Sequence, residues 1–131
     1  MKKFLALAFI LISLFTTAMA QKPKVTSATV ANNKNYTVLN ANESIIIYKY
    51  QHPGHSPKES EKYTSKYYFT TASSDVLQPL TKSNLKKTFP SNHPFHDALD
   101  ATFKDDKELS GYDDFHKMYK LDHIYMSTVK Q

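Results

Sequence analysis

The stretch from Asn92 to Tyr125 constrains the fold of this chain more than any other part of it. Its first half places Phe95, Leu99 and Phe103 at intervals of four residues, which puts three large apolar side chains on one stripe of a helix. Its second half carries another set at helical spacing: Tyr112, Phe115, Met118 and Tyr119. Two short helices with aromatic faces need a surface to cover them, so we expect the rest of the chain to supply one.

The first twenty residues have the three-part organisation of a secretory signal peptide. Lys2 and Lys3 supply a positive start, residues 4–15 are almost wholly apolar, and Ala18-Met19-Ala20 has the small-x-small pattern of a cleavage site. The apolar run is shorter than the ~20 residues that a spanning helix needs. We therefore predict a protein that is periplasmic or secreted, with no transmembrane segment after cleavage.

Residues 21–131 have the length of a single small domain. The chain contains no cysteine, so neither a disulfide nor a lipid attached to cysteine is expected. Removing Lys2 and Lys3 with the leader lowers the formal net charge from +5 to +3. This excess is too small to argue for nucleic acid as a partner.

The middle of the chain has the alternation and the turn residues of a β-sheet. Glu43–Gln51 is the strongest predicted strand, and its three successive isoleucines favour a central position covered on both faces. Pro79 restricts the last strand to a sheet edge, and His52–Lys62 is expected to be a long exposed loop. The connections are too short for helical crossovers, which favours antiparallel pairing. The extended segments are expected at residues 25–31, 36–39, 43–51, 63–71 and 76–80.

Capping residues mark the start of each predicted C-terminal helix. Thr81 suits the N-cap of a helix at Lys82–Phe89, and Asn92 suits the N-cap of the next one. Ser110 and Asp113 have the spacing of a capping box at the start of the last helix. The predicted fold class is therefore α+β, with a small, mainly antiparallel sheet of about four strands followed by three short C-terminal helices packing on it.

The same C-terminal segments resemble a known group of proteins. The segments are Thr81–Pro90, Asn92-His93, Phe95-His96-Asp97, Tyr112-Asp113 and Phe115–Lys120. Together they are similar to the C-terminal helical part of small exported proteins of unknown function found in Bacteroidota. The resemblance implies a structural module, and it brings no activity, cofactor or catalytic residue with it.

Histidine is the chemically most suggestive residue type in the chain. The six histidines fall in three pairs: His52/His55, His93/His96 and His116/His123. Neutral imidazole is a common ligand of zinc and copper. The best constellation is His93 and His96 with a third ligand from His116 or His123, and we take His93, His96 and His116 as the candidate metal site. The alternative is that these histidines are ordinary polar residues of a loop and of helix ends, because no spacing matches a zinc signature.

Other features leave the function open between three classes. Tyrosines interleaved with lysines on the predicted strands favour a protein or glycan partner, although tyrosine also suits a half-buried strand. The acids at residues 105–114 lack the pattern of a calcium-binding loop. No catalytic motif is present, and two glycines are too few for a phosphate-binding loop. We expect an exported, non-enzymatic protein without a cofactor that acts through surface interactions; the alternatives are a periplasmic Zn/Cu-binding protein and a small hydrolase.

Overall fold

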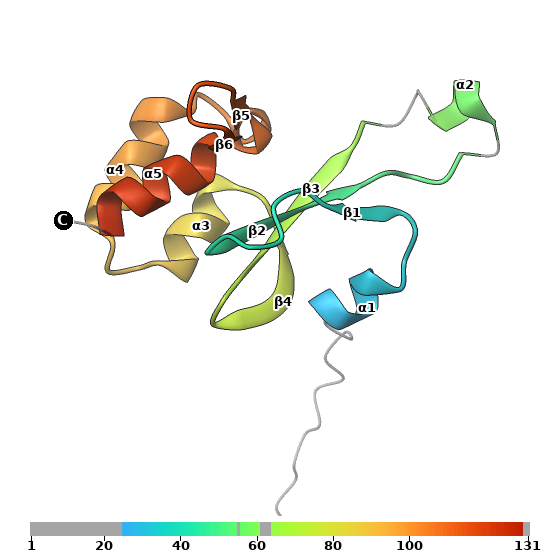
Figure 1. The fold of residues 1–131 in the computed structure, drawn as a ribbon, viewed down its shortest axis with the longest axis horizontal. Coiled ribbons are helices and arrows are strands. Elements are labelled where there is room, and N and C mark those ends of the chain that lie inside the picture. The colour runs from blue at the N-terminus through green and yellow to red at the C-terminus, as the bar shows by residue number, and fades with distance from the viewer. Residues whose placement is uncertain (1–24, 55, 61–63, 130–131) are drawn as a thin grey trace, which may run out of the picture.

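Four strands form an antiparallel sheet in the order β1-β2-β3-β4 (Figure 1). They are β1 (Tyr36–Val38), β2 (Ile45–Tyr50), β3 (Lys66–Thr71) and β4 (Ser74–Pro79). This computed structural model describes residues 25–54, 56–60 and 64–129, so the predicted leader, His55 and Tyr63 lie outside the described residues. The predicted four-stranded antiparallel sheet is confirmed, with β2 in the interior of the sheet and the proline-containing β4 at an edge.

Three helices of seven or more residues follow the sheet, as predicted. They are α3 (Lys82–Thr88), α4 (His93–Thr102) and α5 (Lys120–Val129). A 3-10 turn, η1 (Asp106–Ser110), and a small hairpin of β5 (Tyr112–Asp113) and β6 (Met118–Tyr119) connect α4 to α5. Figure 1 shows these elements gathered at one end of the sheet, while α2 (Pro57–Ser60) lies beyond its other end. No helix within the described ranges has both the length and the apolar composition that crossing a membrane requires.

The core lies between one face of the sheet and the C-terminal helices. Alternation along β2 and β3 turns Ile45, Ile47 and Phe69 to the same face. The predicted α4 stripe is fully buried against it, together with side chains from the neighbouring helices. The core residues are Ile45, Ile47, Phe69, Leu80, Leu85, Phe95, Leu99, Phe103, Leu109 and Leu121. The first two helix caps are also confirmed, since the side chain of Thr81 accepts from the N–H of Asn84 and that of Asn92 from the N–H of Phe95.

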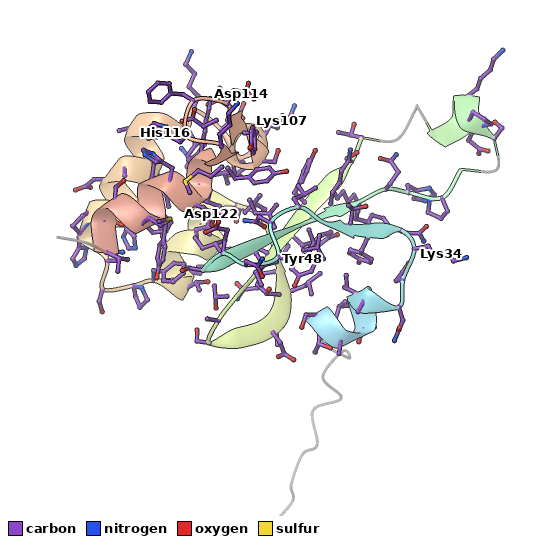
Figure 2. All side chains as sticks on the ribbon, in the orientation of Figure 1. Lys34, Tyr48, Lys107, Asp114, His116 and Asp122 are labelled. Atoms are coloured by element: carbon purple, nitrogen blue, oxygen red, sulfur yellow. The ribbon has the colours of Figure 1, made fainter. Side chains whose placement is uncertain are left out.

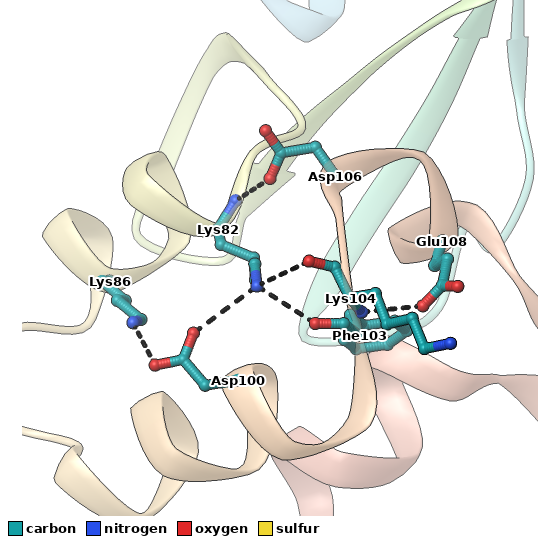
Figure 3. A network of polar contacts seen from close by, with 7 residues as sticks. All are labelled: Lys82, Lys86, Asp100, Phe103, Lys104, Asp106 and Glu108. Atoms are coloured by element: carbon teal, nitrogen blue, oxygen red, sulfur yellow. Dashed lines mark hydrogen bonds and ion pairs between the residues drawn. The ribbon is translucent and has the colours of Figure 1, made fainter.

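A polar network joins α3 to the end of α4 (Figure 3). The Lys82 ammonium donates to the carbonyl oxygen of Phe103 at 3.0 Å and lies 3.6 Å from the Asp100 carboxylate. Lys86 donates to the same carboxylate at 2.6 Å, and this hydrogen bond holds the pKa of Asp100 below its ordinary value. Because carbonyls at a helix end lack partners within the helix, Lys82 fixes the angle between α3 and α4 by capping α4 from outside.

The predicted strand at residues 25–31 is wrong. Only its start is extended, where Thr26 bridges Val76 and the carbonyl oxygen of Val25 accepts from the N–H of Leu77. The chain then turns into the short helix α1 (Ser27–Ala31), which buries Val30. The preference of Val and Thr for strands is weak, so the burial gained by one helical turn beside β4 outweighs it.

The last predicted helix begins later than predicted, because its first part, with the stripe of Tyr112, Phe115, Met118 and Tyr119, is not helical. These residues form the β5–β6 hairpin, and the last helix begins only at Lys120. One oxygen of the Asp113 carboxylate accepts from the N–H groups of Phe115 and His116, which offers the backbone a turn in place of a helix. Lys117 then has a φ of 55°, which no helical residue adopts, and the Phe115 side chain is 87% exposed.

Candidate functional site

The two histidines at the start of α4 lie near each other but are engaged differently. The His93 and His96 ring centroids are 5.7 Å apart, with the rings edge to face. The Nε2 atom of His96 lies 2.8 Å from the carbonyl oxygen of Phe89 and therefore donates to it. A nitrogen that carries a proton for a backbone carbonyl has no lone pair for a metal, so only Nδ1 of His96 remains available as a ligand.

His116, the predicted third ligand, pairs with His123 and not with the α4 histidines. Its ring stacks on the His123 ring with 3.8 Å between centroids. The two rings come from different elements, since His116 lies in the hairpin turn and His123 in α5. Over the ranges that the structure describes, no three His, Cys, Asp or Glu side chains are grouped to hold a metal ion. The structure therefore does not bring His93, His96 and His116 together as one set of metal ligands.

The His116 imidazole is held in place by the hairpin itself. Its Nδ1 atom lies 2.6 Å from a carboxylate oxygen of Asp113, three residues earlier. This hydrogen bond holds the pKa of the Asp113 carboxyl below its ordinary value. Because Nδ1 donates to Asp113, the neutral ring has its lone pair on the second nitrogen, Nε2.

A pocket of about 260 Å³ opens beside the stacked imidazoles. It lies between the hairpin and one side of α5, and His116 is visible there in Figure 2. The residues that line it are His116, Met118, His123, Met126 and Ser127. Both methionines that follow the predicted leader therefore reach the same pocket, which the histidine spacing alone does not indicate. The signal in the sequence is that each of these histidines has a methionine close after it: Met118 follows His116 by two residues, and Met126 follows His123 by three.

The face of the sheet opposite to the core carries four tyrosines, which we call the tyrosine face: Tyr36, Tyr48, Tyr50 and Tyr68. The register pairs Tyr36 with Tyr50 and Tyr48 with Tyr68 across neighbouring strands. The Tyr36 ring centroid lies 4.8 Å from that of Tyr50 and 6.1 Å from that of Tyr68. Burial, and then the neighbouring Tyr68 and Tyr50, raise the pKa of Tyr36, so its hydroxyl stays protonated.

The tyrosines of this face are covered to different degrees. Tyr48 is buried, and its hydroxyl lies 3.1 Å from that of Thr70 (Figure 2). This hydrogen bond stabilises the pairing of β2 with β3, so Tyr48 has a structural role. Tyr36, Tyr50 and Tyr68 are half-buried. Lys66 pairs with Tyr50 and lies at the rim of the face, whereas Lys49 points to the opposite side. Each face therefore carries one of these two lysines, and Tyr67 lies on the core side together with Lys49.

A buried carboxyl lies between α5 and the beginning of β2 (Figure 2). Asp122 is 1% exposed, and one of its oxygens accepts from the Asn40 amide. Its other oxygen, Oδ1, has no hydrogen-bond partner among the described residues. Burial raises the pKa of Asp122 to about 7; the Asn40 hydrogen bond acts against this, and the Glu43 charge adds to it.

A hollow of about 220 Å³ lies next to this carboxyl. Its charged lining consists of Glu43, Lys117 and Asp122, and asparagine, tyrosine, methionine and leucine side chains complete it. A carboxyl with a pKa near 7 in a hollow has the protonation behaviour of a general acid or base. The sequence does not single out Asp122, which it places inside the last predicted helix, whereas in the structure it lies in the first turn of α5.

Comparisons with protein-family models, with curated proteins and with solved structures gave no match to this chain. The resemblance to small exported proteins of Bacteroidota therefore stays a prediction.

Proposed function

We propose that this chain is an exported, non-enzymatic protein that binds a protein partner through its tyrosine face. The single observation that carries the proposal is that the sheet buries one face under the helices and leaves three half-exposed tyrosines on the other. Export is supported by the predicted leader, and the absence of a catalytic motif in the sequence supports a binding role.

The composition of the tyrosine face is that of a recognition surface. Tyrosine offers a large, rigid ring together with a hydrogen-bonding hydroxyl, and it is enriched where proteins bind each other. Val38, which is 45% exposed, and the half-buried Ile46 lie on the same face and add apolar area. Lys66 adds a charge at the rim, where it favours specificity over affinity.

A protein fits this surface better than a glycan does. The apolar side chains of Val38 and Ile46 extend the face beyond the tyrosines, and burying such area stabilises a protein complex. A sugar could stack the C–H face of its ring on a tyrosine, but the hydroxyls at the ring edge need hydrogen-bonding partners that Val38 and Ile46 do not offer. We therefore take a protein as the partner and treat a glycan as an outcome of the test.

The test uses the untagged protein as bait in an extract of the producing cell's envelope. It compares wild type with one double variant and one single variant. In Tyr36→Thr/Tyr50→Thr the rings are lost, but threonine keeps the preference for strands. Tyr112→Thr is the matched control, because Tyr112 is an exposed strand tyrosine in the β5–β6 hairpin. We expect one protein to be retained by wild type and by the control, and lost by the double variant.

Three outcomes would contradict the proposal. Equal retention by all three baits would place the contact elsewhere on the molecule. Binding of purified envelope polysaccharide, again lost in the double variant, would make the partner a glycan. A hydrolytic activity that disappears in Asp122→Asn would make the chain an enzyme. Circular dichroism and urea unfolding of each variant establish that a loss of binding does not result from unfolding.

A further inference from the structure

We infer that the pocket between the β5–β6 hairpin and α5 is a binding site for a soft monovalent metal ion, Cu(I), with His116, His123, Met118 and Met126 as its ligands. This site is separate from the tyrosine face and does not depend on the function proposed for it. It also differs from the candidate site at His93, His96 and His116, because it takes only one residue from that set.

The donor set identifies the class of ion. Thioether sulfur is a soft, polarisable and uncharged ligand, which suits Cu(I) and is poorly suited to Zn²⁺ or to hard cations. Imidazole suits copper as well. The chain has no cysteine whose thiolate would compete for the ion. Two imidazoles and two thioethers around one pocket therefore favour Cu(I).

Packing alone does not explain the two methionines that line this pocket. Met118 and Met126 are half-buried and neither belongs to the core cluster. The chain has four methionines, and Met1 and Met19 both fall within the predicted leader. The rest of the chain thus places all of its thioethers at one pocket, next to two of its imidazoles.

The backbone brings the four ligands together from two elements. His123 and Met126 are three residues apart on α5, and this spacing places them on one side of the helix. His116 and Met118 flank Lys117, whose positive φ ends the hairpin turn and leads the chain into β6. The site therefore exists only because residues 112–119 form a hairpin, since a helix there would continue into α5.

Asp113 prepares His116 for this role. Its carboxylate lies 2.6 Å from Nδ1 of His116, which leaves Nε2 as the free lone pair. A carboxylate on the far nitrogen is the usual outer partner of a metal-bound histidine, because it fixes the ring and makes it more basic. Asp113 is thus a positioning residue, which acts on the ion through His116.

One rearrangement is required on binding. The His116 and His123 rings are stacked at an interplanar angle of 28°, and stacked rings do not direct their nitrogens at a common point. His116 is tied to Asp113, so His123 is the ring that turns. Its side chain is half-buried and borders the pocket, so rotation about its side-chain bonds brings a ring nitrogen toward the thioethers.

The test titrates Cu(I) into the untagged protein without oxygen, in competition with a chromophoric Cu(I) chelator. We expect one Cu(I) per chain and shifts in the ¹³C-methyl NMR signals of Met118 and Met126. The variant Met118→Leu/Met126→Leu keeps side-chain volume and hydrophobicity, so the fold is retained. It should bind Cu(I) more weakly by over about tenfold, the scale on which even an outer partner of a metal ligand acts.

Two further variants locate the site and the positioning residue. Asp113→Asn should weaken Cu(I) binding by about tenfold to 100-fold while the methionine methyl shifts persist, because it acts through His116. His93→Gln is the control and should bind Cu(I) as wild type does. The inference fails if the Met→Leu variant binds Cu(I) as tightly as wild type. It also fails if no Cu(I) binds at one equivalent, or if His93→Gln removes the binding.

Discussion

Asp122 shows how much one residue contributes to the behaviour of this chain. Its carboxyl is buried between α5 and β2, where the Asn40 amide donates to one oxygen and the other oxygen has no hydrogen-bond partner among the described residues. Taking a carboxylate out of water without full compensation is costly, and the group responds by binding a proton. Its pKa rises from 3.8 to about 7 for this reason.

The raised pKa predicts that the protein loses stability as the pH rises. Between pH 4 and 7 the folded chain holds a proton on Asp122 that the unfolded chain releases, so this contribution to stability is fully present below about pH 4, falls as the pH rises through this range and is lost above about 7. Asp122→Asn mimics the protonated form. At pH 8 we expect it to be more stable than wild type by on the order of 2–4 kcal/mol, since one pKa unit corresponds to about 1.4 kcal/mol.

Urea unfolding at pH 5 and pH 8 measures this difference, with the exposed Asp114→Asn as the control. The gain should be small at pH 5 and large at pH 8, and the control should follow wild type at both. A variant that is equally destabilised at both pH values would show that the Asp122 carboxylate is stabilising in its charged form.

Among the elements, α4 and the β5–β6 hairpin are opposite cases of the same sequence signal. Both segments carry large apolar side chains at helical spacing. In α4 the periodicity agrees with the Asn92 cap and with the core, and Phe95 and Leu99 are fully buried. In the hairpin the Asp113 turn bonds override the periodicity, and Phe115 points to water.

Burial predicts different costs for truncation in the two elements. Leu99→Ala removes part of a fully buried side chain and should lower the free energy of unfolding by about 2–5 kcal/mol. Phe115→Ala removes a side chain that is 87% exposed and should change it by less than about 0.5 kcal/mol. Urea unfolding of both variants measures the contrast. A large loss from Phe115→Ala would mean that the hairpin folds back and buries this ring.

The hairpin also stores backbone strain at Lys117. A φ of 55° costs a residue with a Cβ roughly 1–2 kcal/mol, whereas glycine adopts it freely. Allowing for the extra freedom of glycine in the unfolded chain, Lys117→Gly should stabilise the protein by roughly 0.5–1 kcal/mol. Lys117→Ala controls for loss of the charge and should give no such gain. Thermal unfolding distinguishes them, and destabilisation by glycine alone would contradict the left-handed turn.

On the scale of the whole molecule, the sheet and the C-terminal helices are tied together at Asn40. Its amide NH₂ donates to the Ile45 carbonyl oxygen at 2.8 Å and to Asp122, and its oxygen accepts from the Ile47 N–H at 2.6 Å. One side chain thus bonds to the central strand and to a helix 82 residues further along the chain. The tie complements the apolar contacts of Ile45 and Ile47 with the helices.

Removing the Asn40 hydrogen bonds should destabilise the sheet and the C-terminal helices together. Asn40→Ala leaves buried polar groups on β2 and Asp122 without their partner, and we expect a loss of roughly 2–3 kcal/mol. Native-state hydrogen exchange should show faster exchange in β2 and α5 together, while the unfolding transition remains single. Faster exchange confined to β2 would show that the sheet and the helices unfold independently.

The sequence determined those parts of the structure in which local signals agree with one another. Alternation and the three isoleucines defined β2, Pro79 placed β4 at an edge, and the caps at Thr81 and Asn92 defined the starts of α3 and α4. Each of these depends on side chains within one turn or one strand of the residue concerned. Such signals are strong because they do not depend on what the distant chain does.

Only the tertiary structure decided which residues meet. The meeting of Asp122 with Asn40, and of two methionines with two histidines at one pocket, follows from how α5 and the hairpin pack. The helix at residues 27–31 and the hairpin at residues 112–119 were decided in the same way. Local preferences there amount to a few tenths of a kcal/mol per residue, and burial and turn hydrogen bonds contribute more.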